Sequence, residues 1–188
     1  MPAAASVSNS CRARDAWQLD TRCCECSGSG LSAELLEWPA VTLAPIRERL
    51  NWEPDPETYQ RIRRLWIAHS RAEDARDLQG LIDTLAEDCV YEIVPTGQRW
   101  EGHAGARAFY TSFLGAFPDV RFELQDIVIG PQGVIEVTRM SGTHRGAWAG
   151  LAPSGRHLST LIVIHFPWQP DVGRFAGERI YYDSRAFD

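Results

Sequence analysis

The sequence predicts an α+β fold in which a curved, mainly antiparallel sheet wraps around three N-terminal helices to form a cone. Helix signals come first along the chain and strand signals come last, in the order α-α-β-α-β-β-β-β. This segregation is typical of α+β domains, whereas regular alternation would favour a parallel sheet. Three helices can cover only one face of such a sheet. A sheet that curves over them leaves a pocket between the two layers.

Three segments carry helix signals. Asp55-Pro56-Glu57 combines a capping Asp, a Pro at the first helical position and an acid in the first turn. Asp77 can cap a second helix, and a third follows Glu101-Gly102-His103 and ends at Pro118-Asp119. Apolar side chains recur three and four residues apart along these segments, as expected for buried helix faces: Ile62, Leu65, Trp66 and His69; Leu78, Leu81, Ile82 and Leu85; Phe109, Phe113 and Phe117.

Five segments carry strand signals, mainly β-branched and aromatic residues bounded by turn residues. The first lies between the second and third helices and ends at Pro95-Thr96-Gly97. Everything beyond the third helix is predicted to be β. The five predicted strands are Cys89–Val94, Val120–Ile129, Val134–Thr143, His157–Phe166 and Glu178–Asp183.

Composition divides the 188 residues into an extension, 1–45, and one domain, 46–188. The extension is rich in Ala, Ser, Gly and Cys, and we expect it to be flexible. It holds four of the five Cys, but no second ligand pair follows, so we expect reduced thiols and no metal. The net charge of −6, without a Lys/Arg block, argues against nucleic acid as a partner. Neither a secretory signal nor a membrane span of ~20 apolar residues is seen, so we expect a cytoplasmic protein.

One segment, Gly142–Arg156, has the sequence GTHRGAWAGLAPSGR. It resembles the G-T-H-x-G-x-x-x-G-L-x-P-T-G-[RK] signature of SnoaL-like polyketide cyclases, in the nuclear-transport-factor-2-like superfamily, with Ser154 in place of Thr. The resemblance extends over about residues 55–185 through four further segments: Leu85–Tyr91, Trp100–Gly105, Phe117–Asp119 and Gly177–Asp183. It implies a cone-shaped fold around a pocket. It also implies, for the family's cyclases, an intramolecular aldol condensation without metal or organic cofactor.

The resemblance also implies a catalytic pair. Asp183 matches the family's acid/base Asp, and His165 matches a His on the preceding strand. Alternation along a strand would place Arg179, Tyr181 and Asp183 on one face, which we expect to be the pocket face. His165 is the polar residue of the apolar run Leu161–Phe166, so it could polarise the reacting oxygen. The alternatives are an exposed Asp at the strand end and a core His bonded to backbone.

Aromatic residues suit the walls of a pocket for a flat apolar ligand, although an ordinary core contains them too. The candidate ligand-binding residues are Tyr91, Trp100, Tyr110, Phe113, His144, Trp148 and Tyr181. Of these, His144 is a candidate, but the sequence favours a structural role for it. Glu136 and Glu178 could point inward, but we expect them to face solvent or form ion pairs. Ile93 occupies the position of the base of ketosteroid isomerases, which argues against that activity.

Two functions are compatible with these residues. The first is a cofactor-independent enzyme of cyclase or isomerase type, using Asp/His acid–base chemistry on a carbonyl substrate resembling a polyketide. The second is a non-catalytic module that binds a hydrophobic ligand. A third possibility is a scaffold whose sheet mediates dimerisation. In each case we expect a homodimer, because the outer sheet face would expose apolar residues such as Phe122, Leu124 and Ile135.

Overall fold

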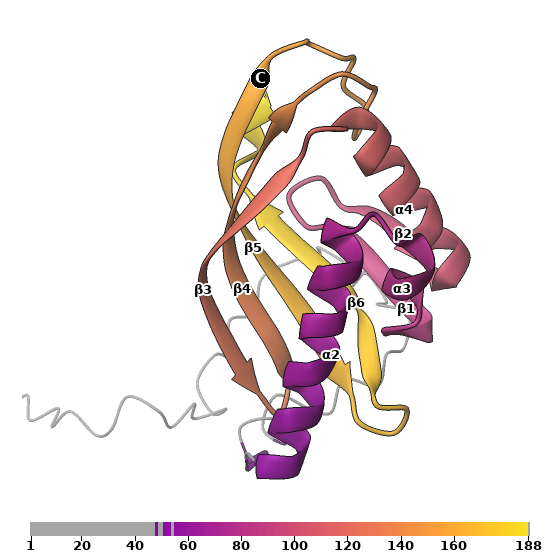
Figure 1. The fold of residues 1–188 in the computed structure, drawn as a ribbon, viewed down its shortest axis with the longest axis vertical. Helices are drawn as coiled ribbons and strands as arrows, with labels where there is room; N and C mark the ends of the chain where they lie inside the picture. Colours follow the sequence, from indigo (N-terminus) through magenta and orange to yellow (C-terminus); the bar gives the residue numbers. More distant parts are fainter. Residues whose placement is uncertain (1–47, 49–50, 54, 188) are drawn as a thin grey trace, which may run out of the picture. The chain divides into compact units, whose positions relative to one another are not determined.

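The computed structural model describes residues 48, 51–53 and 55–187, so the predicted extension lies outside the described residues. In the domain, helices line one side of a strongly curved sheet (Figure 1). The elements in chain order are α2 (Pro56–Asp74), α3 (Leu78–Ile82), β1 (Leu85–Ile93), β2 (Gln98–Glu101), α4 (Gly102–Ala116), β3 (Arg121–Gly130), β4 (Gly133–Thr143), β5 (His157–Gln169), β6 (Arg174–Tyr182) and the 3₁₀ turn η1 (Ser184–Phe187).

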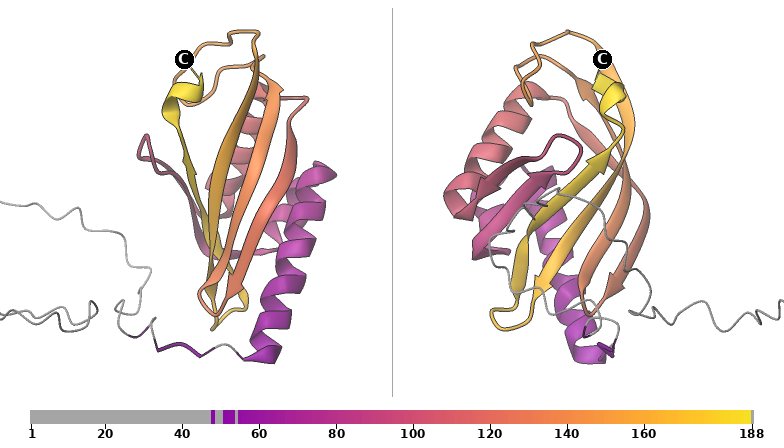
Figure 2. Two further views of the ribbon diagram at one scale, coloured as in Figure 1. Left: turned by 90° about the vertical axis from the view of Figure 1, so that its left-hand side faces the viewer. Right: turned by 180° about the vertical axis from the view of Figure 1, so that it is seen from behind.

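The six strands form one sheet in the order β2-β1-β6-β5-β4-β3. β1 and β6 pair in parallel, and every other neighbouring pair is antiparallel. Figure 2 shows the curvature of this sheet from two further directions. The predicted α+β class with a mainly antiparallel curved sheet is therefore confirmed. No helix in the described ranges is long and apolar enough to cross a membrane.

The predicted helix caps are confirmed. The Asp55 carboxylate accepts hydrogen bonds from the backbone N–H groups of Glu57 and Thr58, and Asp77 caps α3 in the same way. The predicted face of α2 is buried at Ile62 and His69. The assignment of Leu85 to the face of the second helix is wrong. The Thr84 hydroxyl and N–H both bond to the Leu81 carbonyl, which ends α3, and Leu85 begins β1.

The strand predictions are correct in number beyond α4 but differ at their ends. β2 is a short strand of four residues that carries no clear alternation, and the sequence analysis missed it. β6 begins at Arg174 and ends at Tyr182, so Asp183 lies beyond it. Gly177 lies inside this strand at φ 114°, where a Cβ would be 2.0 Å from the Val90 carbonyl oxygen. Gly177, which precedes the predicted strand Glu178–Asp183, therefore lies within β6, and a glycine is required there because β6 approaches β1 so closely.

The inner face of the sheet is defined by the cross-strand register. Glu136 pairs with Ile164, which pairs with Ile180; all three are buried. Because side chains alternate along a strand, His165 and Tyr181 lie on the opposite, outer face. The hydrophobic core is formed by buried side chains of β1, β4, β5 and β6 together with the apolar faces of α2, α3 and α4.

Candidate functional site

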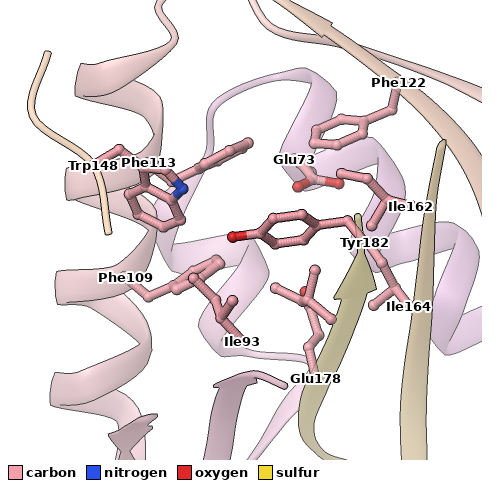
Figure 3. Close-up of a pocket in the computed structure, with 11 residues that line it drawn as sticks. Glu73, Ile93, Phe109, Phe113, Phe122, Trp148, Ile162, Ile164, Glu178 and Tyr182 are labelled. Carbon is pink, nitrogen blue, oxygen red and sulfur yellow. The ribbon is translucent and has the colours of Figure 1, made fainter. Parts of the chain in front are cut away.

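A small pocket lies between the inner face of the sheet and the helices, and the enclosed space measures about 30 Å³ (Figure 3). Its walls come from α2, β1, α4, β3, β5, β6 and the loop after β4. The lining residues are Glu73, Ile93, Phe109, Phe113, Phe122, Trp148, Ile162, Ile164, Glu178, Ile180 and Tyr182. Apart from two carboxylic acids and one phenol, this lining is hydrophobic.

Trp148 reaches the pocket from a tight turn. Trp148 and Leu151 exchange two backbone hydrogen bonds of 3.1 and 2.8 Å across Ala149 and Gly150. Both central residues have positive φ, 51° for Ala149 and 84° for Gly150, as in the two-residue turns of β-hairpins. The indole packs edge-on against Phe109 and Phe113, with ring centroids 5.4 and 5.1 Å apart. The turn thus holds a large aromatic side chain against one wall of the pocket.

The signature motif attaches this loop to the end of α4. The Thr143 N–H and hydroxyl donate to the two Asp119 carboxylate oxygens, both at 2.7 Å. The His144 ring stacks on Phe117 at 5.1 Å between centroids, and Arg145 N–H donates to the Ala116 carbonyl. His144 is buried but does not line the pocket. The segments Phe117-Pro118-Asp119 and Gly142–Gly146 are therefore one structural unit.

Beneath the pocket lies a buried polar cluster, defined here as His69, Thr84, Tyr91, Tyr110 and Glu178. Glu178 Oε1 accepts from the Tyr110 hydroxyl at 2.6 Å and lies 3.0 Å from His69 Nε2. The other ring nitrogen, Nδ1, lies 2.7 Å from the Thr84 hydroxyl. The Tyr91 hydroxyl is 3.1 Å from that of Tyr110. The cluster connects α2, the α3–β1 junction, α4 and the parallel strands β1 and β6.

Burial changes the acidity of the groups around Glu178. Burial, and then the charges of Glu178 and Glu136, raise the pKa of Glu73 well above its usual range. Burial also raises the pKa of Glu136 to about 7, opposed by a hydrogen bond of 2.9 Å from the Trp66 indole. Burial raises the pKa values of Tyr91, Tyr110 and Tyr182. The Glu73 carboxyl therefore holds its proton more tightly than an ordinary carboxylic acid, and it lies in the same pocket as Glu178.

The expected orientation of the predicted catalytic pair is wrong. Asp183 is exposed, and its carboxylate accepts three hydrogen bonds from Arg185, which lower its pKa. His165 lies on the outer face between Ile135 of β4 and Arg179 of β6. Tyr181 is also on that face and is exposed. The structure does not bring Asp183 and His165 together in the pocket, because β5 and β6 turn their even-numbered side chains inward.

The remaining predicted residues divide into two groups. Phe113 and Trp148 line the pocket. Tyr91 and Tyr110 lie below it in the buried polar cluster, and Trp100 packs against Phe109 and Trp148 without lining it. Glu136 and Glu178 do not face solvent, because both are buried on the inner face of the sheet. The other expectation, an ion pair, is met for Glu178, whose Oε1 lies 3.0 Å from His69 Nε2.

Three pocket residues with polar side chains were not among the predicted site residues: Glu73, Tyr182, and Glu178, which was named only as a possible inward carboxylate. A signal for Glu73 exists, since it lies four residues after His69 on the face that carries Ile62 and Trp66. In the predicted strand Glu178–Asp183, the two charges of Arg179 and Asp183 fall on one face and the single charge of Glu178 on the other. The face with fewer charges is the buried one. Among the residues that the structure describes, no group of three or more His, Cys, Asp or Glu side chains is arranged to hold a metal ion.

Comparison with known proteins gives a family and a set of similar folds. The model of the SnoaL-like polyketide cyclase family matches residues 57–187. The structure is similar to that of a SnoaL-like polyketide cyclase from Jannaschia sp. CCS1, with 20% identity, TM-score 0.60, and coverage of 72% of this chain and 94% of that one. AclR of Streptomyces galilaeus, named as a hydroxylase, is 21% identical with a TM-score of 0.55, and the match covers 67% of this chain and 91% of AclR. TerC, crystallised with polyporic acid, is 14% identical with a TM-score of 0.55, and the match covers 68% of this chain and 95% of TerC. A search of curated proteins finds no match.

Proposed function

The chain belongs to the SnoaL-like polyketide cyclase family, and we propose that it is an enzyme of cyclase or isomerase type that applies acid–base chemistry to a carbonyl compound without a cofactor. The observation that supports this proposal most directly is the placement of Glu178 and Glu73 in an otherwise hydrophobic pocket. Two carboxylic acids in one pocket can serve as an acid and a base, and the raised pKa of Glu73 favours this residue as the acid.

In the proposed reaction, the Glu178 carboxylate removes a proton from a carbon next to the substrate carbonyl. The electrons of the broken C–H bond form the enolate, whose oxygen accepts a hydrogen bond from the protonated carboxyl of Glu73. In a cyclisation, the enolate carbon then attacks a second carbonyl carbon of the same molecule. The new alkoxide takes up one proton, so the product contains the same atoms as the substrate.

The walls favour a flat, hydrophobic substrate. Phe109, Phe113, Phe122 and Trp148 present aromatic surfaces to the pocket, and TerC, which has a similar fold, was crystallised with polyporic acid. Pockets for drug-sized ligands usually measure roughly 300–1,000 Å³, whereas the enclosed space in this pocket is about 30 Å³. We therefore propose that Trp148 and its turn move outward when substrate enters.

The alternative function is a module that binds a hydrophobic ligand without reaction. The observation that favours it is the same hydrophobic lining, since aromatic walls alone can hold such a ligand. The two functions differ in what they require of Glu178. A binding module needs the shape of this side chain, whereas an enzyme needs its charge.

The test uses exchange of the α-protons of 2-tetralone, a flat aromatic ketone, in D₂O, followed by NMR. We expect the wild-type protein to accelerate exchange and Glu178→Gln to lose about 10²-fold or more of that rate, as is usual for a removed general base. Asp183→Asn is the matched control: it makes the same carboxylate-to-amide change outside the pocket and should retain the wild-type rate.

Three results would contradict the proposal. If Asp183→Asn loses the rate and Glu178→Gln keeps it, Asp183 is the base, as the resemblance implied. If all three proteins exchange 2-tetralone at the same rate above buffer, Glu178 is not the base. If all three bind 2-tetralone, as judged by quenching of tryptophan fluorescence, but none accelerates exchange, the binding module is the better description.

A further inference from the structure

His69 of α2 is the buried histidine whose two ring nitrogens both have partners in the buried polar cluster. Its side chain is 1% exposed, and the ring is enclosed by Tyr110, Phe166 and Phe175. The Nδ1 atom faces Thr84 and the Nε2 atom faces Glu178 and Tyr110. The hydrogen atoms in this cluster can be counted, because each hydroxyl group has only one to donate.

The Thr84 hydroxyl decides which ring nitrogen carries hydrogen. It donates to the Leu81 carbonyl at 2.6 Å, and a carbonyl can only accept. The contact of 2.7 Å between Thr84 Oγ1 and His69 Nδ1 must therefore use a hydrogen on the ring. This assigns the N–H to Nδ1, whatever the charge of the imidazole.

The other side of the ring needs one additional proton. Tyr110 donates its single hydrogen to Glu178 Oε1 at 2.6 Å, and the Tyr91 hydroxyl can donate to Tyr110. The contact of 3.0 Å between His69 Nε2 and Glu178 Oε1 then has no hydrogen from a hydroxyl group. Without a further proton, a nitrogen lone pair would face a carboxylate oxygen, which is repulsive in a buried site. One proton between these two atoms turns the contact into a charge-assisted hydrogen bond.

We infer that His69 is a positioning residue for Glu178, and that the pair holds one proton between Nε2 and Oε1. The positioning role rests on the proposed function, whereas the count of hydrogen atoms does not. His69 and Tyr110 both contact Oε1, and the Tyr91 hydroxyl also forms a hydrogen bond with the Glu178 side chain, so three residues orient this carboxyl. The other titratable groups that face the pair are Glu73 of α2, Tyr91 of β1, Tyr110 of α4 and Glu136 of β4.

The first test is long-range ¹H–¹⁵N NMR of the full chain with ¹⁵N-labelled histidine, of which there are five. The His69 signals are those lost in His69→Gln. We expect the chemical shift of a protonated nitrogen at Nδ1 in the wild type and in Thr84→Ser, which keeps the hydroxyl. Thr84→Val removes the acceptor and should shift the ring toward the Nε2–H form. A wild-type ring with bare Nδ1, or a Thr84→Val spectrum equal to that of Thr84→Ser, would overturn the assignment.

The second test counts the proton at neutral pH. The ¹³C shift of the Glu178 carboxyl, identified by its loss in Glu178→Gln, is read together with the Nε2 shift of His69. An imidazolium with a carboxylate, or a neutral ring with a carboxylic acid, supports the inference, since each holds one proton. A bare Nε2 beside an ionised carboxylate would overturn it, as would a protonated Nε2 beside a carboxylic acid.

The kinetic test separates this inference from the proposed function. In exchange of 2-tetralone, Thr84→Val should lower kcat roughly tenfold with little change in KM, and Thr84→Ser should restore it, because a hydrogen bond to a charged group is lost and regained. Equal kcat in both variants would overturn the positioning role. If the wild type itself does not accelerate exchange, the proposed function and the positioning role both fail, and the proton count is decided by the two spectra alone.

Discussion

Glu136 is the buried residue whose ionisation should be visible in the stability of the protein. Its side chain lies on the inner face of β4, and burial raises its pKa to about 7 from a usual value of 4.5. The folded state therefore retains a proton that the unfolded chain releases above pH 4.5. The stabilisation that this provides is complete below pH 4.5 and is lost as the pH rises through 7.

We predict that Glu136→Gln removes this dependence on pH. The difference in free energy of unfolding between wild type and variant should fall by about 3 kcal/mol between pH 4.5 and 8, since each pKa unit corresponds to about 1.4 kcal/mol. The amide can still accept the hydrogen bond from Trp66. Urea unfolding at the two pH values measures the change, with the exposed Glu123→Gln as control. Parallel pH dependence in wild type and Glu136→Gln would show that Glu136 ionises in the folded state as it does in the unfolded chain.

At the scale of single elements, the contact between α4 and the signature loop explains in physical terms why the motif has a glycine at position 146. A Cβ on Gly146 would lie 2.9 Å from Ala116 Cα and 3.0 Å from the Gly115 carbonyl oxygen. Both neighbours are backbone atoms, so they cannot rotate away. The glycine is required for the close approach that positions the Trp148 turn.

Two neighbouring glycines give opposite predictions for the same substitution. Gly146→Ala should lower the free energy of unfolding by roughly 1–3 kcal/mol, the usual cost of overpacking. It should also displace the Trp148 side chain from its contact with Phe113. Gly115→Ala should raise it by up to about 1 kcal/mol, because it lies in α4 with no atom within 4 Å of the new Cβ. Thermal unfolding measures both. A Gly146→Ala protein as stable as the wild type would mean that the loop is not held at this contact.

The inward faces of β5 and β6 show what alternation along a strand can leave undecided. Both faces of Leu161–Phe166 are largely apolar, so pattern alone did not distinguish Ile162 and Ile164 from Leu161 and Val163. A shift of one residue moves every side chain to the opposite face. The sequence analysis assigned the wrong face of these strands to the pocket. It therefore predicted Tyr181 and Asp183 as pocket residues in place of Glu178 and Tyr182, and it predicted His165 in a pocket that this side chain does not reach.

At the scale of the whole molecule, the outer face of the sheet carries an exposed apolar surface. Its exposed residues on β3 to β6 are Val128, Ile135, Leu161 and Tyr181. The sequence analysis named Phe122, Leu124 and Ile135 for this outer face, and only Ile135 is an exposed residue on it. Phe122 lines the pocket on the inner side, and Leu124, although exposed, pairs with the buried Thr138. An apolar surface of this kind on a sheet is usually covered.

We predict that a second copy of the chain covers it and that the protein is a homodimer at micromolar concentration. The double variant Val128→Asp/Ile135→Lys should be monomeric, because it places charges in the middle of the interface. Leu151→Lys, at an exposed loop position away from this face, should remain dimeric. Size-exclusion chromatography with light scattering measures all three masses. A monomeric wild type would exclude the outer face as a contact between copies.

The sequence alone determined the features that depend on local chemistry. The caps at Asp55 and Asp77, the glycine turns and the apolar period of α4 are set by neighbouring residues. The helix positions, the number of strands beyond α4 and the family signature could therefore be identified. Only the tertiary structure decided which residues form the site. Glu73, Glu178 and His69 meet through the pairing of β6 with β1 and the packing of α2 on the sheet. Their approach depends on strand register across distant parts of the chain, and a one-residue difference in register reverses which side chains are buried.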